Sequence, residues 1–275
     1  MEPSKQQRRI ESLLSLTRQP VGLKLFFTRE QWQACEMPVP RSKMPYCVMV
    51  RMAGEGFCWK AELEQVGCMG GARALGMVPL DEAYRSGLMF DGLKLYCGME
   101  TAKQVAGCMT LVQKKTVGYA VAPLGQWATE PPDVVLFVGM PYSAMRIVQG
   151  YTYQFGTNTE YRMAGNQAIC SECSAYPFER QKLNLSMLCS GTRIKAGWKE
   201  NELALGIPYA QLEGLLDGIE ATVNPMDDDA HKAQIAQKLG PECRLKPSEI
   251  QYHHNYFTGL FQTDRKRFTK EDNHE

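Results

Sequence analysis

Two apolar segments near the middle of the chain restrict its fold more than any other feature. Residues 117–124 and 133–138 are apolar at nearly every position, so a strand formed by either is apolar on both faces. Such strands lie at the centre of a sheet that helices cover on both sides. The second segment runs through residues 139–142 into a helix expected over 143–153, and ligands of such units commonly bind beyond the strand's carboxyl end. Arg146, on that helix, is therefore a candidate pocket residue.

The spacing of apolar residues predicts further elements on either side of these strands. Helices are expected near residues 4–18, 46–53, 70–76, 100–112 and 209–223, and strands near residues 22–27, 93–97, 183–189 and 202–207. The length of 275 residues suits one large core or two modest ones. The pattern predicts an α/β or α+β single domain in which a central mixed sheet is flanked by helices.

The composition of the chain changes after residue 223. The rest contains the acidic run Asp227-Asp-Asp229, scattered charge and the basic run Arg265-Lys-Arg267. We expect a cysteine-rich body over residues 1–223 and a C-terminal helical appendage over residues 224–275. The appendage is expected to pack on the body or on a second subunit of a homo-oligomer.

Charge and hydropathy exclude two classes of partner. The chain has 31 Lys and Arg against 30 Asp and Glu, a net charge of +1, and an even charge balance disfavours nucleic acid as the main partner. No apolar stretch approaches the roughly 18 residues that span a bilayer, and the first twenty residues lack the features of a signal peptide. A cytoplasmic protein is therefore expected, with its thiols kept reduced.

Ten cysteines occur in this chain, and half of them lie beside glycine or one residue from it. These are Cys58, Cys68, Cys97, Cys108 and Cys189. Glycine lets backbone N–H groups approach a thiolate closely, whether the sulfur binds a metal, holds an iron–sulfur cluster or attacks a substrate. Reduced cysteines are ligands, catalytic groups or small buried side chains rather than disulfides.

Cys170 and Cys173 form a Cys-x-x-Cys pair, a spacing that fits a metal knuckle, two cluster ligands or a redox dithiol. A structural zinc site needs a second close pair, and the sequence has none. The cysteine spacing of ferredoxins is also absent. From the residues alone, a cluster, zinc and plain burial of the thiols all remain open.

Histidine chemistry is confined to the C-terminal part of the chain. The four histidines are His231, His253, His254 and His274. Neither a Ser-His-Asp nor a Cys-His nucleophile system can therefore be drawn within the body. The sequence also lacks a phosphate loop and a Gly-x-Gly-x-x-Gly motif after a strand, so nucleotide cofactors are unsupported.

Six short motifs follow one another between residues 20 and 223. They are Pro45-Tyr-Cys47-Val, Cys68-x-Gly-Gly-x-x-x-Leu-Gly76, Val121-Ala-Pro-Leu124, Pro132-Asp-Val-Val-Leu-Phe137, Ala168-x-Cys170, and Leu188-Cys-x-Gly-x-Arg193 leading to Gly206-Ile-Pro208. In this order they resemble the bacterial and archaeal domain of unknown function 169 family. The resemblance implies a cytosolic protein of a family common in anaerobes, and it supplies no reaction.

The resemblance also indicates which thiols belong together. Cys47, Cys68, Cys170 and Cys189 lie in shared motifs, whereas Cys173 and the other cysteines fall outside them. Four thiols are the number that a [4Fe–4S] cluster needs, so these four are the expected metal ligands.

Two arginines and one glutamate complete the candidate site. Arg193, four residues after Cys189, and Arg146 are expected to bind a carboxylate or phosphate close to the cluster. Glu172 lies between two thiols, where it either moves protons or is simply exposed to solvent.

The leading hypothesis is a [4Fe–4S] protein of anaerobic metabolism, with a redox or Lewis-acid role beside a small-molecule pocket. One alternative is a cluster-free enzyme in which Cys68, at a helix start, is the nucleophile. Another is a binding module for an apolar or tetrapyrrole-like ligand, with the thiols as filler. Whether the chain is an enzyme, and which substrate or redox partner it has, stays open.

Overall fold

Six strands form one sheet at the centre of the protein, in the order β2-β3-β1-β4-β6-β5. The strands are β1 (Val21–Phe26), β2 (Trp59–Glu62), β3 (Gly118–Pro123), β4 (Val134–Gly139), β5 (Asn184–Ser186) and β6 (Leu203–Pro208). The structure is a computed structural model that describes residues 2–128, 130–227 and 229–245. Within these residues every pairing between neighbouring strands is antiparallel.

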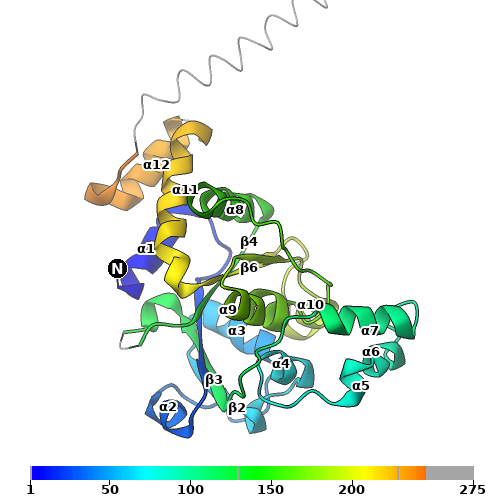
Figure 1. Cartoon of the computed structure of the whole chain (residues 1–275). Helices are drawn as coiled ribbons and strands as arrows, with labels where there is room; N and C mark the ends of the chain where they lie inside the picture. The colour runs from blue at the N-terminus through cyan, green and yellow to red at the C-terminus, as the bar shows by residue number, and fades with distance from the viewer. Residues whose placement is uncertain (1, 129, 228, 246–275) are drawn as a thin grey trace, which may run out of the picture.

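Helices surround this sheet in the single domain (Figure 1). They are α1 (Pro3–Leu13), α2 (Arg29–Ala34), α3 (Tyr46–Gly54), α4 (Met69–Ala74), α5 (Glu82–Arg85), α6 (Leu88–Gly92), α7 (Met99–Cys108), α8 (Pro141–Phe155), α9 (Tyr176–Arg180), α10 (Ser190–Ala196), α11 (Leu212–Met226) and α12 (Asp229–Leu239). A π-helix, η3 (Ala168–Ala175), leads directly into α9. The predicted single domain of helices around a central sheet is thus confirmed.

The central strands are buried on both faces, as the two apolar segments predicted. Along β4, Val134, Leu136 and Val138 pack on one side with α3, η3 and α10, whereas Val135 and Phe137 pack on the other with α1, α8 and α11. Burial on both faces reveals cover by helices but not strand direction. The sequence therefore could not decide between parallel and antiparallel pairing. We expected a mixed sheet, and in the structure the described strands pair only in antiparallel fashion.

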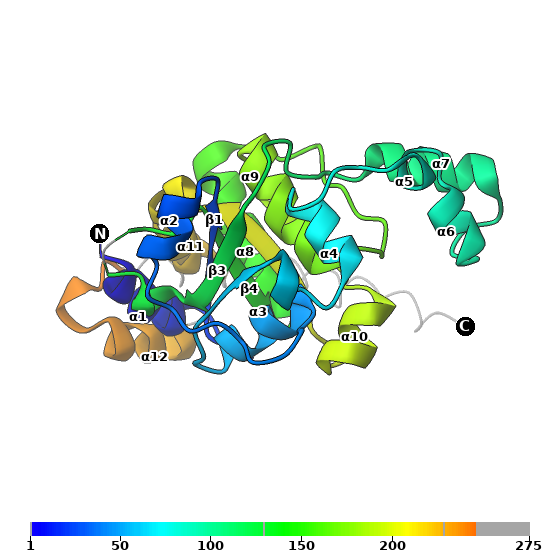
Figure 2. The same cartoon turned by 90° about the horizontal axis from the view of Figure 1, so that it is seen from below.

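A small lobe made of α5, α6 and α7 projects from one end of the protein, where Figure 2 shows it most clearly. Its own apolar core contains Tyr84, Phe90 and Ala102, and the partly buried Cys170 of η3 packs against that core. The lobe therefore joins the body beside the π-helix.

On the other face of the sheet, α1 is held to α11 by a buried arginine. The guanidinium of Arg9 lies 2.6 Å from a carboxylate oxygen of Glu220, 2.7 Å from one of Asp217 and 3.2 Å from one of Glu213. Burial of the Arg9 and Glu220 side chains makes each depend on the other for charge compensation.

We predict that Arg9→Ala lowers the free energy of unfolding by about 2 kcal/mol, because Glu220 is left buried without its cation while Asp217 and Glu213 are partly solvated. Chemical denaturation measures this loss. Arg8→Ala, at an exposed position of the same helix, is the matched control. Equal stabilities of the two variants would contradict the assignment.

The C-terminal part of the described chain continues from the body without a break in helix α11. The expected boundary at residue 223 lies within α11, and Ile235 of α12 is buried in the core that α1 and α11 share. The division into a body and an appendage stays a prediction, because residues 246–275 lie outside the described chain. No helix in the described part is long and apolar enough to cross a membrane.

Candidate functional site

The four cysteines of the shared motifs line one cavity. It has a volume of about 470 Å³, and we call it the cysteine cavity because Cys47, Cys68, Cys170 and Cys189 all lie in its wall. They come from α3, the start of α4, η3 and the start of α10, segments that span more than half of the chain. The fold thus brings together four sulfur-bearing residues that are far apart in the sequence.

Each of these cysteines lies at the beginning of a helix. Cys68 and Cys189 immediately precede α4 and α10, Cys47 is the second residue of α3, and Cys170 is the third residue of η3. The first N–H groups of a helix have no partner within it, and the helix dipole favours negative charge there. Four helix starts therefore surround a cavity in which thiolates would gather.

Two glycines lie beside two of these sulfurs. A Cβ atom added at Gly70 would lie 3.7 Å from Sγ of Cys68, and one added at Gly191 would lie 3.9 Å from Sγ of Cys189. Both glycines line the cysteine cavity. At these two positions the glycine two residues after the cysteine in the sequence also lies close to its sulfur, with the added Cβ atom within van der Waals distance of it.

Sγ of Cys189 takes part in two short contacts with its own helix. It accepts a hydrogen bond from the N–H of Thr192, at an N–S distance of 3.4 Å, and lies 3.0 Å from Oγ1 of Thr192. A hydrogen bond donated to sulfur stabilises its charged form.

The pKa values of two of these thiols are raised by their surroundings. Burial, together with the charges of the neighbouring Cys189 and Cys68 thiols, raises the pKa of Cys47 to about 11. Burial raises the pKa of Cys170 well above its usual value, again with contributions from Cys68, Cys189 and Cys47. The four sulfurs therefore influence one another, and they become thiolates together only where a positive centre compensates their charge.

The spacing of the four residues distinguishes between kinds of metal centre. In the described ranges, no three His, Cys, Asp or Glu side chains are grouped tightly enough to hold one metal ion. A tetrahedral zinc site requires sulfurs about 3.8 Å apart, since each Zn–S bond is about 2.3 Å long. A cubane cluster binds each cysteine to a different iron, so its ligands stand farther apart. Four cysteines in the wall of one cavity match the number of ligands that a cubane takes.

The rest of the cysteine cavity is mainly apolar, with two basic residues at its wall. The apolar side is formed by Met69 and, from the lobe, by Met89, Phe90, Leu93 and Leu95. The basic residues are Arg73 and Lys195. The guanidinium of Arg73 pairs with Asp81 at 2.8 Å, and its buried Nε has no hydrogen-bond partner among the described residues.

The Cys-x-x-Cys pair is divided by the π-helix. Cys170 lines the cavity, whereas Cys173 is fully buried in the core between η3 and the sheet. The remaining cysteines lie away from the cysteine cavity, and the structure contains all ten as free thiols. The fold therefore separates the two members of the motif.

Neither arginine of the expected site lines the cysteine cavity. Arg193 donates hydrogen bonds to the carbonyl oxygens of Lys199, Met187 at 2.8 Å and Glu202 at 3.1 Å, so its guanidinium closes the loop between α10 and β6. Arg146 is buried between α8 and α11, where it lies 3.2 Å from Asp227. Because α8 covers the opposite face of the sheet from α3, Arg146 and the thiols are separated by the sheet.

Glu202, in the loop that Arg193 closes, accepts hydrogen bonds from the N–H of Lys199 at 2.7 Å and from Thr17 at 2.9 Å, and pairs with Arg18 at 3.3 Å. Burial alone would raise the pKa of Glu202, but these hydrogen bonds and the charge of Arg18 outweigh it and lower the pKa. The unfolded chain thus binds a proton at Glu202 more readily than the folded chain does.

We predict that Glu202→Gln destabilises the protein at pH 7 and that this deficit shrinks as the pH falls below about 4, the usual glutamate range, because the folded carboxylate is then protonated as well. Chemical denaturation of the variant and the unmodified protein, at pH 7 and again below about pH 4, measures the difference in their free energies of unfolding. Glu200→Gln, at an exposed position two residues earlier, is the control. A deficit that does not change with pH would contradict the role given to the Glu202 charge.

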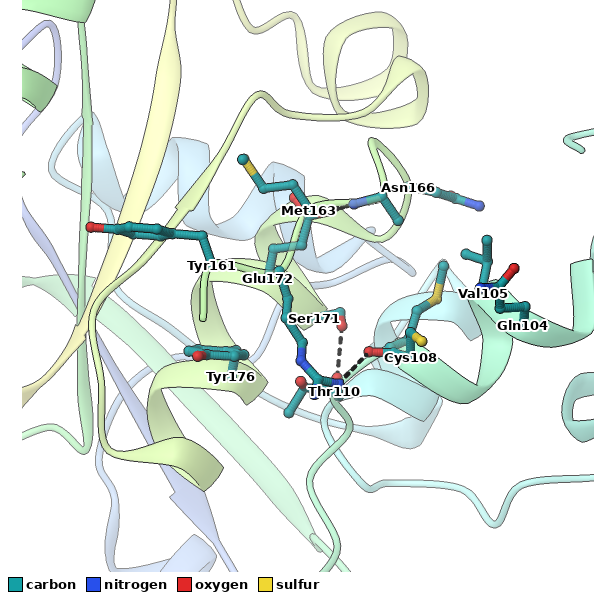
Figure 3. Close-up of a pocket in the computed structure, with 13 residues that line it drawn as sticks. Gln104, Val105, Cys108, Thr110, Tyr161, Met163, Asn166, Ser171, Glu172 and Tyr176 are labelled. Carbon is teal, nitrogen blue, oxygen red and sulfur yellow. Dashed lines mark hydrogen bonds between the residues drawn. The ribbon is translucent and has the colours of Figure 1, made fainter. Parts of the chain in front are cut away.

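A second cavity lies on the other side of η3. It has a volume of about 420 Å³ and shares Asn166 with the cysteine cavity. Figure 3 shows Ser171 and Glu172 of η3 in its wall, with Tyr161 and Tyr176 on one side and Val105 and Cys108 of α7 on the other. We call it the Glu172 cavity. Glu172, for which the sequence suggested exposure to solvent as one option, is only 5% exposed.

Comparison with known proteins gives a family without an assigned reaction. Residues 9–218 match the domain of unknown function 169 family, which is described as "Uncharacterised ArCR". Uncharacterized protein MJ0308 of Methanocaldococcus jannaschii is 26% identical over 215 residues, which cover 78% of this chain and 91% of the relative. No solved structure matches the chain. The chain belongs to the domain of unknown function 169 family.

Proposed function

We propose that this chain is a cytoplasmic iron–sulfur protein of anaerobic metabolism, in which Cys47, Cys68, Cys170 and Cys189 hold one [4Fe–4S] cluster. The observation that carries the proposal is the presence of these four residues in the wall of one cavity. Their number equals the number of irons in a cubane, each of which takes one cysteine.

The surroundings of the four thiols support the same proposal. The helix starts and the basic residues Arg73 and Lys195 favour the negative charge that four thiolates carry. The apolar wall from α6 and the segment after it gives the sulfurs partly apolar surroundings. Limited solvent access and hydrogen bonds to sulfur are two of the means by which proteins set the potential of such centres.

A cluster held by four thiolates supplies one-electron transfer when it is bound. The chain positions the sulfurs on separate segments and buries Cys170 against the core of the lobe. It also donates the N–H of Thr192 to Sγ of Cys189. We expect the protein to pass electrons to or from a redox partner or a small molecule bound beside the cysteine cavity.

The proposal is tested by purifying the protein without oxygen and recording its visible spectrum. The expected result is a brown protein with broad absorption toward the blue end of the spectrum, which is bleached by dithionite. A protein that stays colourless, both as purified and after incubation with ferrous iron and sulfide, would contradict the proposal.

One observation favours a second candidate, a cluster-free enzyme with a cysteine nucleophile. The hydrogen bond from Thr192 N–H stabilises a thiolate at Cys189, whereas the side chain of Cys68 receives no such bond from α4. In that case Cys189, rather than Cys68, is the reactive residue. The candidate predicts a colourless protein in which iodoacetamide modifies Cys189 much faster than the other cysteines, as peptide mapping would show.

A further inference from the structure

The Glu172 cavity contains a buried carboxyl group that no cation of the described chain pairs with. Oε1 of Glu172 accepts the N–H of Ala164 at 2.6 Å, and Oε2 accepts a hydrogen bond from the hydroxyl of Ser186. Among the described residues no Lys, Arg or His lies within ion-pair distance of this carboxylate. An ionised carboxylate in an apolar setting is costly unless a positive charge approaches it.

A cation lines the same cavity without pairing with Glu172. Nη1 of Arg162 donates to the carbonyl oxygen of Cys108 at 3.1 Å, and no carboxylate in the described part of the chain lies within 4 Å of its guanidinium. A guanidinium has five N–H groups and binds a carboxylate through two of them in parallel. Arg162 therefore retains donors for an anionic group.

The fold holds these two residues in place through one buried amide. Asn184 of β5 donates from Nδ2 to the carbonyl oxygens of Glu172 at 2.8 Å and Arg162 at 2.9 Å. Its Oδ1 accepts the N–H of Arg162 at 3.0 Å. The backbones that carry the two opposite charges are thus tied to one residue of the sheet, which fixes their relative positions.

The remaining walls of the cavity are largely apolar. They are formed by Val105, Met109, Tyr161, Met163 and Tyr176. Aromatic rings and methionine side chains suit an apolar body next to a positively charged nitrogen. A volume of about 420 Å³ lies within the roughly 300–1,000 Å³ range of small-molecule sites.

We propose that the Glu172 cavity binds a small zwitterion, an apolar α-amino acid, whose ammonium group contacts Glu172 and whose carboxylate contacts Arg162. Glu172 and Arg162 line the same cavity but do not pair with each other. A zwitterion compensates both groups at once, whereas a ligand with a single charge compensates only one of them. The proposal goes beyond the cluster and does not depend on it, because none of its contacts involves Cys47, Cys68, Cys170 or Cys189.

The proposal is tested by isothermal titration calorimetry with L-leucine, L-methionine and L-phenylalanine, each compared with its methyl ester and its N-acetyl derivative. The ester lacks the carboxylate and the acetyl derivative lacks the ammonium group. We expect at least one of the free amino acids to bind, and both of its derivatives to bind at least about tenfold more weakly. If no amino acid of this set binds at millimolar concentration, or if a derivative binds equally well, the proposal is wrong.

Two charge-removing variants and two matched controls locate the site. Arg162→Gln and Glu172→Gln are each expected to weaken the binding of the amino acid at least about tenfold, whereas the exposed substitutions Arg180→Gln and Glu64→Gln leave it unchanged. Arg162 is exposed, so its variant is expected to fold even where the buried Glu172 variant does not. Binding that survives Arg162→Gln would overturn the proposal.

A Cys47→Ser chain distinguishes this proposal from the cluster proposal. Amino acid binding by that chain, with or without iron, supports the Glu172 cavity as a site in its own right. Loss of amino acid binding in a folded Cys47→Ser chain would show that the site does not stand independently and would contradict the inference as stated.

Discussion

Replacing any one of Cys47, Cys68, Cys170 or Cys189 by serine is expected to reduce the bound iron from about four atoms per chain to less than about one. Each of the four residues comes from a different segment and lines one cavity, so the removal of one sulfur opens the centre to water and exchange. Serine is a harder and more basic ligand than cysteine thiolate, and it replaces sulfur poorly on iron. The measurement is iron content after reconstitution without oxygen.

Matched controls come from the same chain. Cys35→Ser, Cys97→Ser and Cys108→Ser remove thiols that lie outside the cysteine cavity, and we expect each of these variants to retain the iron content of the unmodified protein. Cys173→Ser tests the Cys-x-x-Cys motif separately, because Cys173 is buried in the core and does not line the cavity. Retention of iron by all four cavity variants would contradict the ligand assignment.

Gly206→Ala is expected to lower the free energy of unfolding by about 3 kcal/mol, because there is no room for a methyl group between β6 and η3. A Cβ atom at this position would lie 1.9 Å from the carbonyl oxygen of Cys173 and 2.9 Å from Cγ of Pro177. Relief requires the backbone of η3 to move away from the sheet. Since η3 also carries Cys170 and Glu172, we expect iron binding to fall as well.

Thermal unfolding measures the effect of Gly206→Ala. A loss of that size corresponds to a fall in melting temperature of roughly 6–10 °C for a chain of this length. Gly107→Ala is the control, because Gly107 lies in helix α7 with no other atom within 4 Å of the added methyl group, and alanine there is expected to stabilise by about 0.5–1 kcal/mol. A Gly206→Ala protein that melts within about one degree of the unmodified chain would contradict the close packing.

Apolar periodicity was sufficient to predict most of the sheet and its helices. The central strands β3, β4 and β6 and the helices α3, α8 and α11 lie within a few residues of the segments expected from the sequence. Each carries a strong apolar pattern because each is buried against the core. In these elements the local apolar pattern of the sequence and the burial of the side chains in the complete fold indicate the same structure.

The lobe and the sheet edge were predicted less well. Residues 93–97 were expected to form a strand, but they connect α6 to α7, and the apolar side chains of Leu93 and Leu95 line the cysteine cavity instead. The edge strand β2 was not expected, since its alternation is short and its side chains are only partly buried. Both errors occur where the apolar pattern reflects contacts that form only in the complete fold.

The candidate site, too, was predicted only where sequence motifs mark its residues, and not where its geometry depends on the complete fold. Family motifs grouped Cys47, Cys68, Cys170 and Cys189, which line one cavity in the structure. Proximity in sequence suggested that Arg193 would face the same site, whereas in the structure its guanidinium donates to backbone carbonyls around α10. Glu172 and Arg162 carry no recognisable motif, since their relation to each other depends on Asn184 and the fold of the sheet.

Counting iron and acid-labile sulfide in the protein purified without oxygen tests the central claim most directly. The claim that four thiols from four segments hold one cubane predicts about four irons and about four sulfides per chain. A folded chain that contains neither iron nor sulfide, or that binds a single metal ion without sulfide, would contradict it.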